Sequence, residues 1–133
     1  MSETHAVPRS VPVIRWIARI WSGVVFALAI LEIVYPDPYA TEPVPAADWF
    51  LLSLWGVAIL GLAAAWRWEA IGAMIAIVTM FLREAAFFLL KGFWHPAFLI
   101  IWILIVPPAI MFLAAWGLTR KVQRAGPPKP EVP

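Results

Sequence analysis

Four long apolar stretches, separated by short polar connections, dominate the pattern of this chain. They run over about residues 14–35, 48–66, 70–90 and 97–118. Each is close to the ~20 residues that an α-helix needs to cross the hydrocarbon core of a bilayer. A membrane-spanning β-barrel would need strands of alternating polarity, and these stretches do not alternate. The pattern therefore predicts four transmembrane helices, with Asp48 as the N-terminal cap of the second.

The connections between these stretches are short. The first is proline-rich, over residues 36–45, and the others cover residues 67–69 and 91–96. Short connections make consecutive helices antiparallel, so we expect an all-α fold, a four-helix transmembrane bundle with up-down topology. Residues 1–13 are expected to form a cytoplasmic N-terminal segment. Residues 119–133 are expected to form a basic, proline-rich, disordered cytoplasmic tail.

Composition supports the membrane assignment. Of the 133 residues 63% are hydrophobic, and the mean hydropathy is +0.85. A small soluble domain leaves much of its surface in water and cannot hide so much apolar area. The net charge of +2 does not point to nucleic acid, because the basic residues flank apolar stretches instead of forming one soluble face. The lipid bilayer is the partner that the composition predicts.

The distribution of Lys and Arg predicts the orientation of the bundle. Lys91 is the only basic residue expected on one side of the membrane. Eight basic residues are expected on the other side: Arg9, Arg15, Arg19, Arg67, Arg120, Lys121, Arg124 and Lys129. Basic residues concentrate in cytoplasmic segments, so both termini are expected in the cytoplasm.

Three charged residues are expected together at the cytoplasmic face. Arg19 can reach Glu69 if the first and third helices are neighbours, and Arg67 lies in the connection just before Glu69. The favoured interpretation is a structural clamp in which the arginine stems also extend toward the interface. The alternative is a ligand or lipid-headgroup site.

A second charge cluster is expected toward the outer face. It contains Glu32 of the first helix, Arg83 and Glu84 of the third, and Lys91. Arg83 and Glu84 point ~100° apart on a helix, so at least one is expected to need a partner on another helix. Glu32 is expected to pair with Arg83, and Lys91 to neutralise Glu84. A latch of ion pairs is favoured over a substrate, proton or partner site, and it predicts that Glu32→Gln lowers thermal stability.

Two backbone features are expected to shape the bundle. Pro107 and Pro108 fall near the middle of the fourth helix, where they are expected to kink or break it. Small residues spaced four apart are expected to let helices approach closely, within the bundle or between protomers. These pairs are Gly23/Ala27, Gly61/Ala65 and Gly72/Ala76.

The residues required for enzyme chemistry are scarce. The chain has no cysteine, and its two histidines are His5, near the N-terminus, and His95, in the last connection. This distribution assembles no metal site, no bis-histidine haem site and no catalytic triad. No enzyme activity, cofactor or metal is expected.

Two motifs carry a resemblance. The first is Ala18-Arg19 in the first stretch, and the second is the run Ala-Trp-Arg-Trp-Glu-Ala-Ile-Gly at residues 65–72. Together they resemble a family of small, uncharacterised prokaryotic four-span membrane proteins with an Ala-Trp-x-Trp-Glu-x-x-Gly turn. The resemblance implies a four-span fold and its topology, but no activity. The chain is expected in a prokaryotic plasma (inner) membrane. Small multidrug resistance transporters are a weaker likeness, since Glu32 lies near the end of its span.

Two functions remain open on the sequence. The first is a non-catalytic accessory or assembly subunit, or a homo-oligomeric scaffold, with a membrane protein or a second copy as partner. The second is a small proton-coupled transporter or channel that uses Glu32, Arg83 and Glu84. A cavity that reaches these residues would favour the second, and a dry, ion-paired bundle the first.

Overall fold

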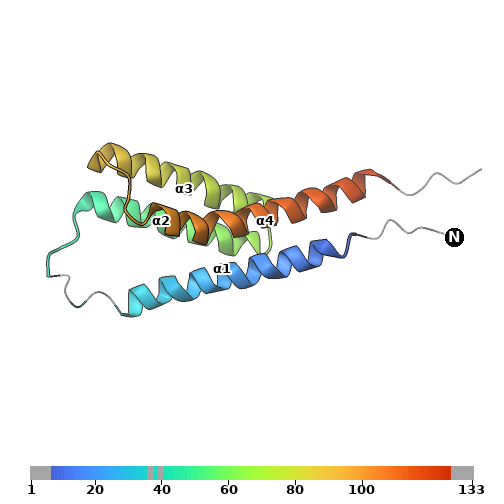
Figure 1. Cartoon of the computed structure of the whole chain (residues 1–133), viewed down its shortest axis with the longest axis horizontal. Helices are drawn as coiled ribbons and strands as arrows, with labels where there is room; N and C mark the ends of the chain where they lie inside the picture. Colours follow the sequence, from blue (N-terminus) through green and yellow to red (C-terminus); the bar gives the residue numbers. More distant parts are fainter. Residues whose placement is uncertain (1–6, 36–37, 39–40, 127–133) are drawn as a thin grey trace, which may run out of the picture.

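The computed structural model describes residues 7–35, 38 and 41–126, and these form an all-α bundle of four antiparallel helices (Figure 1). The helices are α1 (Ser10–Val34), α2 (Ala46–Ala65), α3 (Glu69–Lys91) and α4 (Phe98–Arg124). Each is long and apolar enough to cross a membrane. The fold class expected from the sequence, a four-helix bundle, is confirmed.

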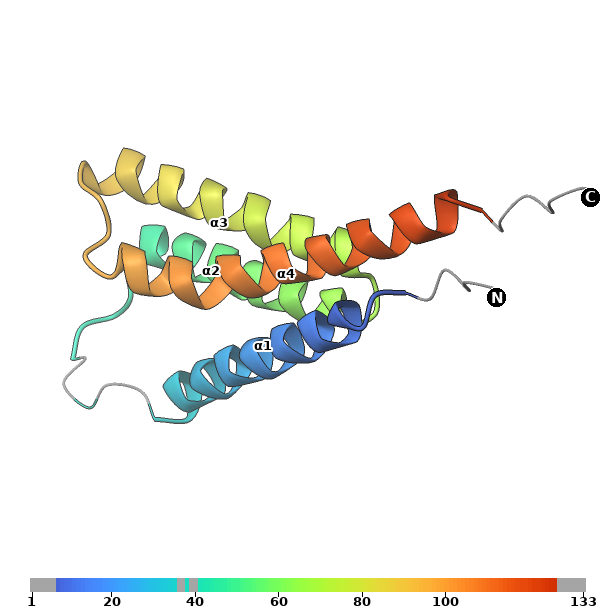
Figure 2. The same cartoon turned by 45° about the vertical axis from the view of Figure 1, so that its right-hand side comes forward.

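Both described chain ends lie at the same end of the bundle, at the right in Figures 1 and 2. This end also holds the turn between α2 and α3, and we call it the terminal end. The other end holds the α1–α2 and α3–α4 connections, and we call it the loop end. Expectations for residues 1–6, 36–37, 39–40 and 127–133 lie outside the described residues.

The helix boundaries correct three expectations. Helix α1 begins at Ser10, not at residue 14, and α4 continues to Arg124, so residues 119–124 are helical and not part of a disordered tail. Arg120 lies over the ring of Trp116 at 4.5 Å, and basic side chains favour the negative end of a helix. Asp48 is not the cap of α2; Pro45 holds that position and Asp48 lies in the first turn, where its charge still favours the helix.

The two prolines do not break α4. The helix runs through Pro107 and Pro108, although these residues cannot donate hydrogen bonds to the carbonyls of Ile103 and Leu104. Pro108 is fully buried, as is the neighbouring Ile105. Packing against other helices keeps such a segment helical, so α4 does not break there, and the expected kink stays a prediction.

The lateral order of the helices is α2, α3, α4, α1. Helix α2 packs most extensively on α3, α3 also packs on α4, and α1 packs mainly on α4. Helices α1 and α2 touch at few positions, and the backbones of α1 and α3 do not meet. Because the bundle is not closed between α1 and α2, a cleft of about 660 Å³ opens there toward the loop end.

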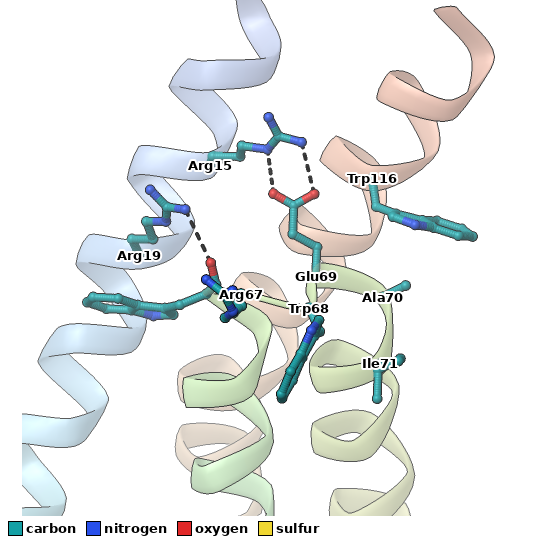
Figure 3. Close-up of a pocket in the computed structure, with 9 residues that line it drawn as sticks. Arg15, Arg19, Arg67, Trp68, Glu69, Ala70, Ile71 and Trp116 are labelled. Atoms are coloured by element: carbon teal, nitrogen blue, oxygen red, sulfur yellow. Dashed lines mark hydrogen bonds and ion pairs between the residues drawn. The ribbon is translucent and has the colours of Figure 1, made fainter. Parts of the chain in front are cut away.

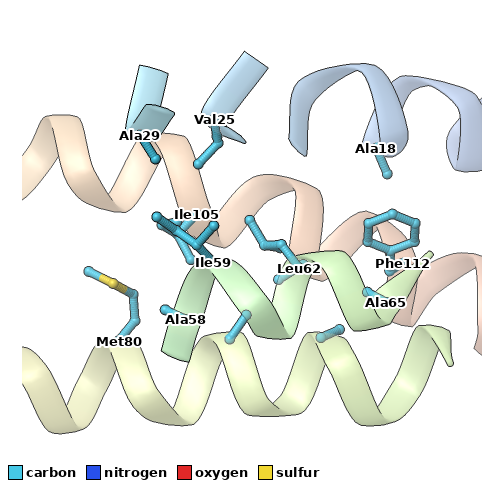
Figure 4. Close-up of a cluster of buried hydrophobic side chains, with 13 residues drawn as sticks. Ala18, Val25, Ala29, Ala58, Ile59, Leu62, Ala65, Met80, Ile105 and Phe112 are labelled. Carbon is cyan, nitrogen blue, oxygen red and sulfur yellow. The ribbon is translucent and has the colours of Figure 1, made fainter. Parts of the chain in front are cut away.

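The core lies along the bundle axis (Figure 4). Its largest fully buried apolar side chains are Phe112, Leu62, Met80 and Ile105. Helices α2 and α3 approach closely at two glycines: a Cβ on Gly72 would lie 2.1 Å from the Ala65 nitrogen, and one on Gly61 2.8 Å from the Ala76 nitrogen. The expected small-residue contacts at Gly61/Ala65 and Gly72/Ala76 are therefore confirmed.

Candidate functional site

A clamp of polar side chains joins three helices at the terminal end (Figure 3). Arg15 of α1 donates from Nε and Nη2 to the two carboxylate oxygens of Glu69, the first residue of α3, with 3.1 Å between Nη2 and Oε2. The same Nη2 donates to Thr119 Oγ1 on α4 at 3.1 Å. A carboxylate at the start of a helix is also favoured by the helix dipole. This bidentate ion pair thus connects α1 to α3, although the backbones of these two helices are not in contact.

Arg19 is not the partner of Glu69, contrary to the sequence expectation. Its Nη2 donates to the Trp66 carbonyl at 3.3 Å, and the Trp66 indole donates to Ser22 Oγ at 2.8 Å. Ser22 Oγ donates in turn to the Arg19 carbonyl at 3.0 Å. The reason is position along α1, because Arg15 lies one helical turn closer to the terminal end, where Glu69 begins α3. Arg19 instead joins α1 to the end of α2.

A cavity of about 440 Å³ lies beside the clamp. Its walls come from α1, from the α2–α3 turn with the start of α3, and from α4. Figure 3 draws the lining residues as sticks. Arg67 is on this wall but is exposed, and its side chain forms no hydrogen bond or ion pair with the other described residues. The lining residues are Arg15, Arg19, Trp66, Arg67, Trp68, Glu69, Ala70, Ile71 and Trp116.

The charged pair near the loop end is arranged differently from the expectation. Arg83 and Glu84 are buried, with 8% and 3% of their surface exposed, and they bond to each other through Arg83 Nη1 and Glu84 Oε1. Their long side chains bend together although their Cβ atoms diverge. The expected pair of Glu32 with Arg83 is absent, and Glu32 is exposed. Arg83 Nε and Glu84 Oε2 stay buried without a hydrogen-bond partner among the described residues.

Lys91 pairs with Asp48, not with Glu84. The distance from Lys91 Nζ to Asp48 Oδ1 is 2.8 Å, and the pair joins the last turn of α3 to the first turn of α2. Because α2 and α3 are antiparallel neighbours, these two turns meet at the loop end. Both side chains are partly exposed, so the link contributes on the order of 0–1 kcal/mol to stability.

A second cavity of about 440 Å³ brings four polar side chains together near the loop end. Glu32 and Arg83 line it, with Asp48 and His95, and apolar residues of α2 and α4 form most of the remaining wall. Glu84 and Lys91 do not line it. Two of the four residues expected in the outer cluster therefore share a cavity, although they do not pair.

His95 lies on the wall of this cavity in the α3–α4 connection. The Ala97 backbone N–H donates to His95 Nδ1 at 3.0 Å, which requires an unprotonated Nδ1. Partial burial, and then the positive charge of Arg83, lower the pKa of His95 below its ordinary value of 6.5, while Glu84 acts in the opposite direction. The ring is thus held neutral at neutral pH.

Sequence reasoning missed several members of these sites: Arg15 as the clamp residue, Thr119, Ser22, Asp48 and His95. One signal was available, because Arg15 and Arg19 are four residues apart and so lie on the same face of α1. Within the described ranges, no group of three or more His, Cys, Asp or Glu residues is close enough to hold a metal ion.

Four apolar helices of membrane-spanning length, with ion pairs at both ends of the bundle, fit the class of small four-span membrane proteins. Residues 7–125 match the family described as a domain of unknown function, DUF7670, and the chain belongs to that family. No curated protein and no solved structure matches the chain. The description of this family assigns no activity, so the function is argued from the sites.

Proposed function

We propose that the chain is a non-catalytic accessory or assembly subunit of a prokaryotic plasma membrane, with both termini in the cytoplasm. Its partner is a membrane-spanning helix that packs between α1 and α2. The cleft of about 660 Å³ between these helices carries the proposal, because it leaves α1 without a neighbour on that side. In lipid, helices associate through close packing. A helix face without a packed neighbour is therefore where a partner helix can form the most new contacts.

The residues that line the cleft indicate what kind of helix would bind there. Its wall is almost entirely apolar, from Phe26 and Ile33 on α1 and from Trp55 and Ile59 on α2. Glu32 lies at the loop end of this wall, exposed and without an ion-pair partner among the described residues. A carboxylate at this depth favours a partner helix with Lys or Arg near its own membrane boundary.

Photo-crosslinking in the native membrane tests this proposal. Ile33 lines the cleft and is 79% exposed, whereas Leu89, near the same end of α3, is 82% exposed but lines no cavity described above. A photoreactive residue at position 33 should give one adduct of defined mass that Glu32→Lys abolishes. The same residue at position 89 should give none. Equal adducts from both positions, or an adduct insensitive to Glu32→Lys, would contradict the proposal.

The mass of that adduct also separates the two kinds of partner. A second copy of this 14.9 kDa chain would double the mass and support a homo-oligomeric scaffold. Any other reproducible mass that depends on Glu32 would identify a different membrane protein as the partner.

The loop-end cavity favours proton-coupled transport as a second candidate, because it reaches both Glu32 and Arg83. Glu84 does not line it, and fully buried Leu62, Phe112 and Ile105 fill the bundle between the two ends. Transport would therefore need a conformation in which this core opens. Liposomes that contain the chain and a pH-sensitive dye test this candidate: a proton flux abolished by Glu32→Gln would support it, and no flux above empty liposomes would remove it.

A further inference from the structure

The cavity at the terminal end has an excess of positive charge. Three of its lining residues are arginines, Arg15, Arg19 and Arg67, and only Glu69 is acidic. Glu69 is bound by Arg15 through both carboxylate oxygens. The charges of Arg19 and Arg67 therefore have no acidic partner on the cavity wall.

The hydrogen-bonding capacity of these two arginines is largely unused. Arg19 donates from Nη2 to a backbone carbonyl, and its Nε is buried without any partner in the described part of the chain. A buried guanidinium N–H without an acceptor is unfavourable, so contact with a hydrogen-bond acceptor is favoured. The Arg67 guanidinium bonds to no other described residue; Arg67 lies on the α2–α3 turn and lines the same cavity as Arg19 of α1 (Figure 3). The two guanidinium groups thus offer donors to one ligand.

The rest of the wall also favours an anion at a membrane surface. Ala70 and Ile71 lie in the first turn of α3, where backbone N–H groups have no acceptor within the helix and the dipole is positive. Trp68 and Trp116 also line the cavity and are 60% and 36% exposed. Tryptophan rings concentrate at the level of lipid headgroups. Exposed Ile71 continues the wall toward the apolar surface of α3.

We propose that this cavity binds a phosphate group at the membrane surface, with Arg19 and Arg67 as its ligands. Arginine suits this ligand because its planar N–H groups match two phosphate oxygens at once. Arg15 and Glu69 fix the wall and do not bind. The phosphate belongs to an anionic lipid headgroup or to a free anion, and the chemistry that recognises it is the same. This inference goes beyond the partner proposed for the cleft, which lies at the other end of α1.

The test is a binding titration on the full chain in neutral detergent, read by tryptophan fluorescence and by native mass spectrometry. The probes are phosphatidylglycerol, phosphatidylcholine and inorganic phosphate. Phosphatidylglycerol should bind saturably, and about tenfold more tightly than phosphatidylcholine. Competition by inorganic phosphate would show that the phosphate group is recognised. Binding of inorganic phosphate without a preference for phosphatidylglycerol would support the same site with a free anion as its ligand.

Matched variants make the test specific. Arg67→Gln removes one ligand without touching another described side chain, so its fold should be intact, and affinity for phosphatidylglycerol should fall about tenfold. Arg19→Gln should weaken binding similarly, and Arg19→Lys should restore part of it. Arg124→Gln is the control, because it removes one charge from the same end of the bundle but lies outside the cavity. An equal loss in Arg124→Gln, or no binding of either phosphatidylglycerol or inorganic phosphate, would overturn the proposal.

Discussion

At the scale of single residues, Arg83 and Glu84 show how a buried ion pair forms without a partner helix. Adjacent positions on a helix diverge by ~100°, which makes partners on other helices the natural expectation. The guanidinium and carboxylate nevertheless meet, because both side chains are long and an unpaired charge in an apolar interior costs far more than a bent rotamer. The spacing of residues along a helix predicts the direction of each Cα–Cβ bond. It does not predict the position of the charged group at the end of a long, flexible side chain.

This pair reverses a prediction about Glu32. Since Glu32 has no ion-pair partner among the described residues, Glu32→Gln should leave the melting temperature in detergent unchanged. Glu84→Gln should lower stability by about 3 kcal/mol, because it leaves Arg83 buried without its counter-charge. Thermal unfolding followed by circular dichroism compares the two variants directly. A clear loss in Glu32→Gln would show that the expected latch with Arg83 exists after all.

Gly72 offers a second test at the same scale. A Cβ at this position would lie 2.1 Å from the Ala65 nitrogen, a contact with backbone that no side-chain movement relieves. Gly72→Ala should therefore push α2 and α3 apart and destabilise the chain by more than about 2 kcal/mol. Gly117→Ala is the control, since its Cβ would meet nothing within 4 Å, and it should stabilise α4 by up to about 1 kcal/mol. Similar melting temperatures for both variants would contradict the close approach.

At the scale of elements, the apolar stretches predicted which segments are helical better than where the helices end. The four stretches correspond to α1–α4, because apolar runs of spanning length leave few alternatives. Hydrophobicity does not predict that α4 continues past the apolar stretch, where Thr119 and Arg120 contact other side chains. Packing likewise keeps α4 helical through Pro107 and Pro108, and packing cannot be derived from the positions of prolines alone.

The connection between α3 and α4 carries a pH prediction. The pKa of His95 is lowered in the folded chain, so below about pH 6.5 the unfolded chain binds a proton that the folded chain resists. Stability should therefore fall as pH decreases from 7.5 to 5.5, and rise again on return. Protonation would also remove the acceptor that holds the Ala97 N–H.

Melting curves at several pH values check this prediction, in a His5→Gln background so that His95 is the only histidine. The further change His95→Gln should flatten the dependence between pH 5.5 and 7.5. A slope that persists without His95 would assign the effect to other groups.

At the scale of the whole molecule, the sequence predicted antiparallel helices but not which helices are neighbours. Short connections determine direction, whereas the position of α1 beside α4, away from α3, depends on side-chain packing that periodicity does not encode. Glu69 was correctly expected in a clamp, but Arg15, one helical turn closer to the terminal end of α1, reaches it instead of Arg19. The charge excess of the terminal-end cavity has the same origin, because it exists only when the α2–α3 turn lies against α1.

The orientation of the bundle is a final prediction, and the absence of cysteine makes single cysteines clean probes for it. Trp68→Cys and Ala125→Cys lie at the terminal end, and Phe93→Cys lies at the loop end. Eight basic residues were assigned to the side of the termini and Lys91 alone to the other, which favours a cytoplasmic terminal end.

In intact bacterial cells, a membrane-impermeant maleimide should label position 93 only. Positions 68 and 125 should react after the membrane is permeabilised. The reverse pattern would invert the orientation and keep the fold, and it would place the proposed phosphate site at the outer surface. Labelling of positions 68 and 125 from opposite sides would contradict the bundle itself, because both must lie at one end of four antiparallel spans.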